Sequence, residues 1–96
     1  MQTTHKKILT LDELSAKSKE CRDSGKKVVL CHGAFDLIHA GHIRYLKSAC
    51  DQGDLLVVTV TADEFVNKGP GRPVFSQELR VENLGYLSFV DFVDVC

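Results

Sequence analysis

The feature that most constrains the fold is a short apolar run that leads into a glycine and then into two histidines. The run Val28–Cys31 is typical of a buried strand, and Gly33 lets the backbone turn directly after it. His39 and His42, spaced His-x-Gly-His, then open a stretch with the pattern of an amphipathic helix. In an open parallel sheet, ligands bind outside the carboxyl ends of the strands, where the next helix offers unpaired N–H groups. The sequence therefore predicts an anion site at this junction.

The residue types at the junction suit a phosphate. Two imidazoles three residues apart lie on one side of a first helical turn, so both can donate hydrogen bonds to the same phosphate. Gly33 and Gly41 have no Cβ, which lets an anion approach the backbone closely. Two alternatives use the same side chains: histidines that cap the helix or pack in the core, and a metal site. The candidate ligands of that metal site are His32, Asp36, His39 and His42.

The remaining segments alternate between helix and strand patterns. Thr10 and Glu13 have the spacing of a capping box at the start of a helix, and Gly25 is a natural stop. Leu55–Thr61 is almost continuously apolar, which predicts a strand buried on both faces. Three helices are expected: the first has Leu11, Leu14, Ser18 and Cys21 on one stripe, the second runs from about Gly41 to Asp51 with Ile43, Leu46, Ala49 and Cys50 facing inward, and the third follows Ser76 with Leu79, Leu84 and Leu87 facing inward. The other expected segments are a short turn or helix over 62–66, a loop over 67–75 and a last strand over 92–96.

This order predicts an α/β fold. Strand, helix, strand, helix, strand with right-handed crossovers forms one half of a doubly wound, Rossmann-like parallel sheet. We expect residues 1–25 to be a lead-in helix and residues 26–96 to carry the sheet.

Composition limits the function classes. With 96 residues, 44% of them hydrophobic and a net charge of −1, the chain is expected to be one soluble domain without a nucleic-acid or membrane partner. No run is long enough to span a membrane and no signal-peptide core is present. Four scattered cysteines favour a reduced, cytoplasmic protein.

The stretch His32-Gly33-Ala34-Phe35-Asp36, followed by His39-Ala40-Gly41-His42, resembles the signature of the cytidylyltransferase-like nucleotidyltransferases. The chain is particularly similar to the adenylyltransferase domain of bifunctional heptose-phosphate kinase/adenylyltransferases, which also shows in residues 7–14, the loop over 68–74 and Arg80. In that family the first strand is central to the sheet. The resemblance therefore implies that residues 26–96 are the N-terminal part of a nucleotidyltransferase domain, truncated after its third strand.

Such a truncation would leave the first strand with a bare edge. Three explanations are open: a fragment of a longer chain, a partner protomer that supplies the missing half, and a degenerate remnant. The resemblance also implies either a homo-oligomer or fusion to a sugar-kinase domain.

The resemblance implies transfer of AMP from ATP to a sugar 1-phosphate such as heptose 1-phosphate, with Mg²⁺ present and pyrophosphate released. Such a transfer needs positioning and charge stabilisation rather than a protein nucleophile. Three alternatives remain: cytidylyl transfer from CTP to glycerol phosphate or a related alcohol phosphate, a non-catalytic nucleotide-binding module of a kinase-fused protein, and an interaction remnant.

Carried over residue by residue, the resemblance implies catalytic roles for His39, His42 and Arg80 and no protein ligand to a metal. The nucleotide-binding positions that it implies are His32, Gly33, Ala34, Phe35, Asp36, Gly41, Arg44, Lys68 and Arg72. Plainer readings compete at some of these positions: an Asx turn for Asp36, core packing for Phe35, and simple solvation for the cations.

Overall fold

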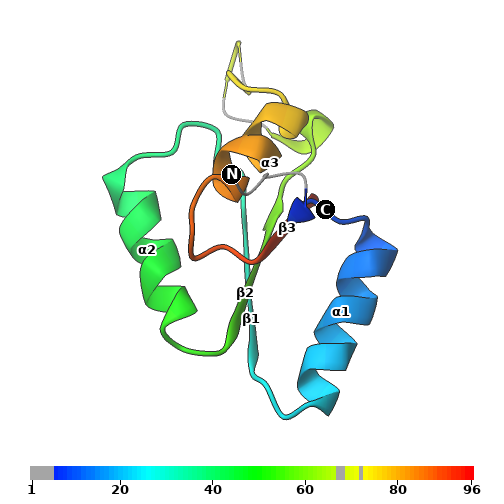
Figure 1. The fold of residues 1–96 in the computed structure, drawn as a ribbon. Coiled ribbons are helices and arrows are strands. Elements are labelled where there is room, and N and C mark those ends of the chain that lie inside the picture. Colours follow the sequence, from blue (N-terminus) through cyan, green and yellow to red (C-terminus); the bar gives the residue numbers. More distant parts are fainter. Residues whose placement is uncertain (1–5, 67–68, 72) are drawn as a thin grey trace.

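Three parallel strands form one sheet in chain order, and helices connect them (Figure 1). The computed structural model describes residues 6–66, 69–71 and 73–96. The predicted loop residues Lys68 and Arg72 lie outside this part. The elements are α1 (Leu11–Asp23), β1 (Val28–Gly33), α2 (Ala40–Cys50), β2 (Leu55–Val60), the 3₁₀ turn η2 (Asp63–Phe65), α3 (Gln77–Gly85) and β3 (Phe92–Val95).

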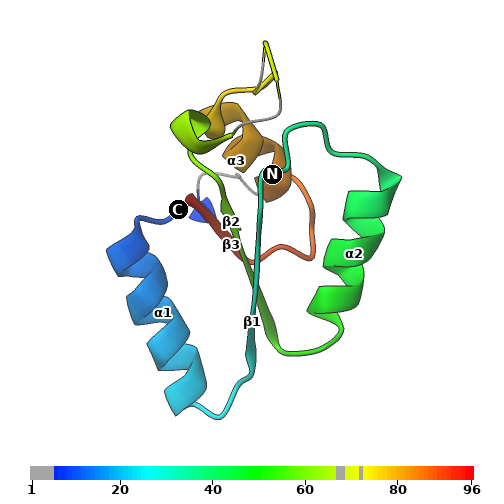
Figure 2. The ribbon, with the colours of Figure 1, turned by 180° about the vertical axis from the view of Figure 1, so that it is seen from behind.

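The sheet separates two layers of helix. α2 lies on one side of β1 and α1 on the other, as both views show (Figures 1 and 2). The core lies between the sheet and the layer of α2 and α3, and its fully buried members are Leu46, Leu56, Val58, Val60, Leu84, Val90 and Val93. β2 is the middle strand and is buried on both faces from Leu56 onward, as its apolar run predicts. The open parallel α/β fold expected from the sequence is confirmed.

The helix starts follow the local sequence. The Thr10 hydroxyl accepts the Glu13 N–H and the Glu13 carboxylate accepts the Thr10 N–H, which completes the predicted capping box of α1. The Ser76 hydroxyl accepts the Leu79 N–H and caps α3 as predicted. Gly25, just after α1, has a φ of +82°, a conformation that glycine adopts without strain.

Two predicted helix faces need correction. In α3, Leu79 is exposed, and the inward positions are Arg80, Val81 and Leu84. In α1 only Leu14 is buried, and Leu11 is more than half exposed. Periodicity identifies both helices, but the position of the sheet decides which side chains it covers.

Residues 7–9, just before α1, run beside β3. Lys7 O accepts the Val93 N–H at 3.0 Å and the Leu9 N–H donates to Val93 O at 3.3 Å, so Ile8 forms a parallel bridge with Val93. This segment covers part of the outer edge of β3. In the described part of the chain no strand pairs with the opposite edge, that of β1.

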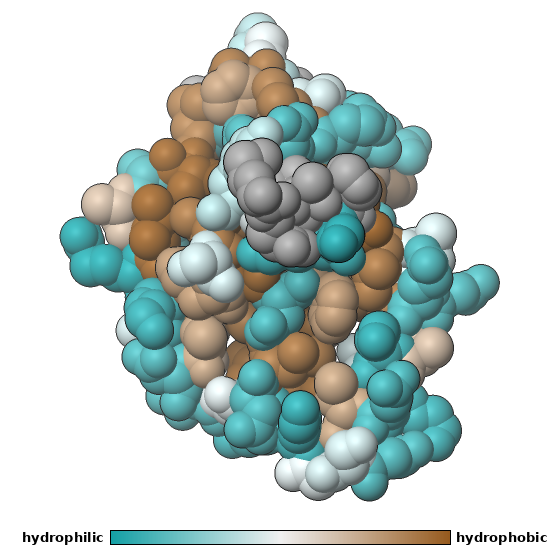
Figure 3. Space-filling model, viewed as in Figure 1, coloured by the Kyte–Doolittle hydropathy of each residue, from teal (hydrophilic) through white to brown (hydrophobic). Residues whose placement is uncertain are grey.

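The face of the sheet beside α1 is only partly covered. Leu30, in the middle of β1, is 64% exposed. It lines an apolar groove of about 370 Å³ together with Leu14 and Val57. Figure 3 shows apolar atoms at the surface beside the mostly hydrophilic α1. No described helix is long and apolar enough to cross a membrane.

Candidate functional site

The first turn of α2 is capped by the two histidines of the His-x-Gly-His pattern. His39 is the N-cap residue, and its Nδ1 accepts the Gly41 N–H at 3.0 Å. His42 Nδ1 accepts the His39 N–H at 3.2 Å. The two rings lie side by side, with their centroids 4.1 Å apart and an angle of 46° between their planes. The two imidazoles that cap the start of α2 therefore also contact each other.

This capping fixes how the imidazoles are protonated in the neutral state. A ring nitrogen that accepts a backbone N–H carries no hydrogen, so the hydrogen of each neutral ring is on Nε2. Each Nε2 is then a hydrogen-bond donor. Both donors lie at the N-terminus of a helix, where the positive end of the helix dipole also favours negative charge.

The glycines of the pattern make room for rings. A Cβ at Gly41 would lie 2.8 Å from His39 Cε1, so a side chain there would displace the capping imidazole. A Cβ at Gly33 would lie 3.0 Å from the Phe35 ring, which is buried and meets the His42 ring edge-on. Packing against His39 and Phe35 thus favours glycine at both positions, and the access of an anion to the backbone stays a prediction from the sequence.

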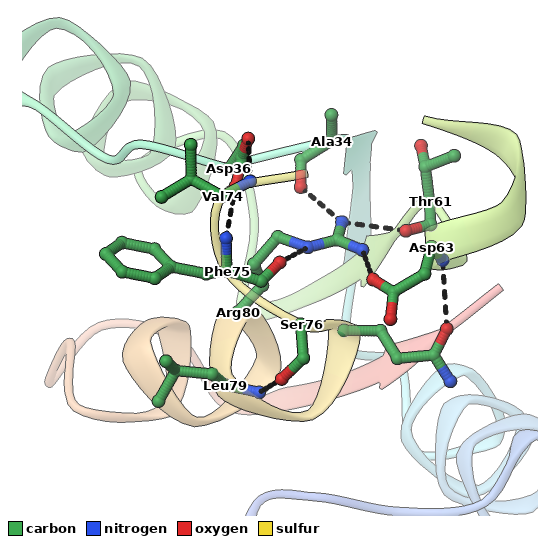
Figure 4. Close-up of polar contacts among 10 residues, drawn as sticks. Ala34, Asp36, Thr61, Asp63, Val74, Phe75, Ser76, Leu79 and Arg80 are labelled. Atoms are coloured by element: carbon green, nitrogen blue, oxygen red, sulfur yellow. Dashed lines mark hydrogen bonds and ion pairs between the residues drawn. The ribbon is translucent and has the colours of Figure 1, made fainter. Parts of the chain in front are cut away.

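Asp36 joins the loop after β1 to the loop before α3. Its side chain is 6% exposed. Oδ2 accepts the Val74 N–H at 2.8 Å and Oδ1 accepts the Phe75 N–H at 2.9 Å, as Figure 4 shows. Phe35, just before it, has a φ of +49°, in the left-handed region that few non-glycine residues adopt. These contacts run between residues nearly forty positions apart, so the local Asx turn considered from the sequence is not what Asp36 forms.

Arg80 is the largest fully buried side chain of the described residues. Its guanidinium donates to Phe75 O (3.0 Å), to Ala34 O and Thr61 O (both 2.7 Å), and to Asp63 Oδ1 (2.6 Å). Figure 4 shows the guanidinium enclosed between these groups. The catalytic role that the resemblance implies for Arg80 would require contact with a substrate phosphate. That contact does not fit this enclosed position, because the side chain has no exposed surface in this conformation.

The peptide group of Phe75 is consequently held from both sides. Its N–H donates to the Asp36 carboxylate and its carbonyl accepts from Arg80. The two charged side chains thus fix the loop at the point where it enters α3.

The other predicted site residues are more dispersed. The Ala34 carbonyl accepts a hydrogen bond from Arg80, and Arg44 is exposed on α2. The His32 ring contacts the hydroxyls of Thr59, in β2, and Thr61, just after β2. Among the residues that the structure describes, no three His, Cys, Asp or Glu side chains gather where a metal ion could be held.

The sequence analysis did not predict two of the partners of Arg80. Asp63 forms the ion pair and Thr61 supplies a carbonyl. Asp63 had a usable signal, an acidic residue close behind the carboxyl end of a buried strand. The contact through the Thr61 carbonyl had no signal in the sequence, because every residue has a backbone carbonyl.

Comparison with known proteins places this site in a family. The family model described as "Cytidylyltransferase-like" matches residues 30–91, a span that contains both histidines, Asp36 and Arg80. The chain belongs to the cytidylyltransferase-like family, and its fold and signature are those of a nucleotidyltransferase domain.

Its relatives are longer proteins. The "Bifunctional protein HldE" of Vibrio cholerae is 44% identical over 88 residues, which are 90% of this chain and 18% of that protein. The protein of the same name from Desulfatibacillum aliphaticivorans is 43% identical over 91 residues, 93% of this chain and 19% of that protein. The chain thus spans about a fifth of these relatives.

A solved structure agrees with the fold. The lipopolysaccharide core biosynthesis protein from Thermoplasma volcanium has a TM-score of 0.69 and 35% identity to this chain. The match covers 75% of this chain and 59% of that one.

Proposed function

We propose that the chain carries the nucleotide-phosphate site of an adenylyltransferase that transfers AMP from ATP to heptose 1-phosphate. The observation that supports this most directly is the capped start of α2, where His39 and His42 each accept a backbone N–H at Nδ1. Their Nε2–H groups are then two oriented donors at a helix N-terminus. That arrangement suits phosphate oxygens.

In this reaction a phosphate oxygen of the sugar phosphate attacks the α-phosphorus of ATP, and the bond to the β-phosphate oxygen breaks as pyrophosphate leaves. The protein supplies no nucleophile. His39 and His42 donate to the phosphate oxygens and stabilise the charge that develops on them. Mg²⁺ accompanies the triphosphate and neutralises part of its charge.

Asp36 and Arg80 act in this proposal as positioning residues. Arg80 joins the ends of β1 and β2 to the loop before α3 through Ala34, Thr61 and Phe75. Asp36 joins the same loop to the segment that leads into His39. They fix the loops around the phosphates, and the cations Lys68 and Arg72 of the predicted loop would bind the phosphates from there.

The choice of ATP and of a heptose 1-phosphate rests on relatedness. The relatives named HldE and the structural neighbour from lipopolysaccharide core biosynthesis support it. It also rests on the resemblance of the Lys68–Val74 loop to heptose-type enzymes. Fusion to a sugar-kinase domain is proposed on the same ground, because the relatives are described as bifunctional.

The proposal is tested first by thermal unfolding with Mg²⁺ and millimolar ATP or CTP. A ligand that binds only the folded state at a hundredfold excess over its dissociation constant stabilises it by about 2.7 kcal/mol. ATP should raise the melting temperature of the wild type, and His42→Ala should abolish the rise. Ser48→Ala, an exposed position on the same helix, is the matched control and should keep it. A rise that survives His42→Ala would overturn the proposed site.

Turnover is tested next with ATP and heptose 1-phosphate, measured as pyrophosphate release. Release that needs both substrates would support the adenylyltransferase. A response to CTP alone would assign a cytidylyltransferase instead, and ATP binding without release would assign a non-catalytic nucleotide-binding module.

A further inference from the structure

A polar row crosses the sheet at its carboxyl end, on the face beside α1. Thr59 of β2 is in register with His32 of β1 and with Asp94 of β3, so the three side chains lie on one face at one level. That face is the one with the groove, which Thr59 also lines. α2, which carries His39 and His42, packs on the opposite face (Figures 1 and 2).

The His32 ring is exposed, yet both of its nitrogens are held. Nδ1 lies 2.8 Å from the Thr59 hydroxyl and Nε2 lies 3.3 Å from the Thr61 hydroxyl. Thr59 is only 6% exposed. Because the ring is held between a buried and a half-buried hydroxyl, its rotamer is restricted. Both polar atoms of the imidazole are used in these contacts, so the ring is an orienting group, whereas the Thr61 hydroxyl has further hydrogen-bonding positions for a ligand.

The second hydroxyl is fixed through its own backbone. The Thr61 N–H donates to Gly33 O at 2.9 Å and the Thr61 carbonyl accepts from Arg80 at 2.7 Å. Figure 4 shows the Thr61 side chain turned away from the guanidinium. Arg80 therefore fixes the loops on one face and the position of the Thr61 hydroxyl on the other.

The charges around the row disfavour an anion. Asp94 completes the row, and Glu13 of α1 lies close enough to act on it. Burial raises the pKa of the Asp94 carboxyl above its usual range, and repulsion from Glu13 raises it further. The Thr61 hydroxyl can donate to or accept from a neutral hydroxyl group, and the row of His32, Thr59 and Asp94 contains no lysine or arginine that would favour a phosphate.

We propose that the Thr61 hydroxyl, oriented by His32, binds a hydroxyl group of the sugar in the acceptor substrate. This inference rests on the proposed function, because a transfer between two substrates needs a second site at the same end of β1. In this arrangement the nucleotide phosphates would bind at His39 and His42 on one face, and the sugar hydroxyl would bind at Thr61, beside His32, on the other. The acceptor phosphate then meets the α-phosphate beyond Gly33, at the end of the strand.

The test follows the imidazoles of the full chain by proton–nitrogen NMR, assigned with single histidine variants. Three probes are added separately: the neutral methyl glycoside of a heptose, inorganic phosphate, and ATP with Mg²⁺. The neutral glycoside should shift the His32 resonances and leave His39 and His42 in place. Phosphate should leave His32 in place. A glycoside that leaves His32 unmoved, or phosphate that shifts it, overturns the inference.

A second test uses a variant that removes only the Thr61 hydroxyl. Thr61→Val keeps the shape and both backbone hydrogen bonds, and it should weaken glycoside binding about tenfold, the loss expected for one hydrogen bond. Ser15→Ala, which removes an exposed hydroxyl on α1 that also lines the groove, should bind like the wild type. Equal binding by Thr61→Val and wild type overturns the inference.

The NMR experiment distinguishes a failure of the proposed function from a failure of the sugar-binding inference. If ATP shifts neither His39 nor His42, the proposed function fails. The response of His32 to the neutral glycoside then still decides whether this face binds sugar hydroxyls.

Discussion

At the scale of single residues, Arg80 is the side chain on which the carboxyl edge of the sheet depends. A buried guanidinium is stable only when its donors are satisfied. Here three backbone carbonyls and the Asp63 carboxylate satisfy it at 2.6 to 3.0 Å. The buried Arg80 thus connects three loops: the one after β1, the one after β2 and the one before α3.

Arg80→Met tests this role because it keeps most of the side-chain volume and removes every donor. The carbonyls and Asp63 lose their partner, and we expect the free energy of unfolding to fall by about 3 kcal/mol or more. Urea unfolding measures the change. Lys19→Met, which breaks an exposed ion pair with Asp23, is the control and should cost less than about 1 kcal/mol. Equal losses in the two variants would contradict the role of Arg80.

At the scale of elements, α2 shows a helix cap that also serves the site. The His39 imidazole satisfies backbone N–H groups that a helix start leaves unpaired. In the proposed function its other nitrogen donates to phosphate. One side chain would therefore support the helix and bind the ligand through two different atoms.

Two substitutions separate these roles. Asparagine is a good N-cap and alanine is a poor one, so His39→Ala should lower the free energy of unfolding by about 1 kcal/mol, whereas His39→Asn should retain most of the stability. Both remove the Nε2 donor, so both should weaken ATP binding about tenfold. Chemical unfolding and calorimetric titration give the two quantities. Wild-type ATP affinity in His39→Asn would show that His39 only caps the helix.

At the scale of the whole molecule, the two sides of the sheet are unequally packed. The side under α2 and α3 holds the buried core. The side beside α1 leaves Leu30 exposed and contains the groove. Stability should therefore depend on one face of the sheet far more than on the other.

This asymmetry is tested with one leucine on each face. Leu56 is fully buried and Leu30 is 64% exposed. Leu56→Ala should cost about 2–5 kcal/mol of unfolding free energy, and Leu30→Ser less than about 1 kcal/mol. Denaturant unfolding at two protein concentrations measures both. A large, concentration-dependent loss for Leu30→Ser would show instead that another copy covers this face in solution.

Several features were predictable because they depend on neighbours in the sequence. The cap of α1 needs only Thr10 and Glu13, and the burial of β2 needs only its own apolar run. The histidine pair was also predictable, since residues three apart meet on a helical turn. The roles of Leu79 and Arg80 were not, because adjacent helical positions face different directions and only the packed sheet determines which is covered.

Local patterns in the sequence are enough to predict the α/β class, the order of the elements and the junction that carries the two histidines. Each of these follows from local patterns of polarity and backbone preference. Three other features depend on how the chain packs: Asp36 reaches Val74 and Phe75, Arg80 is buried among three loops, and His32 lies on the opposite face from His39. These contacts join residues far apart in the chain, and their geometry exists only once the strands are in register.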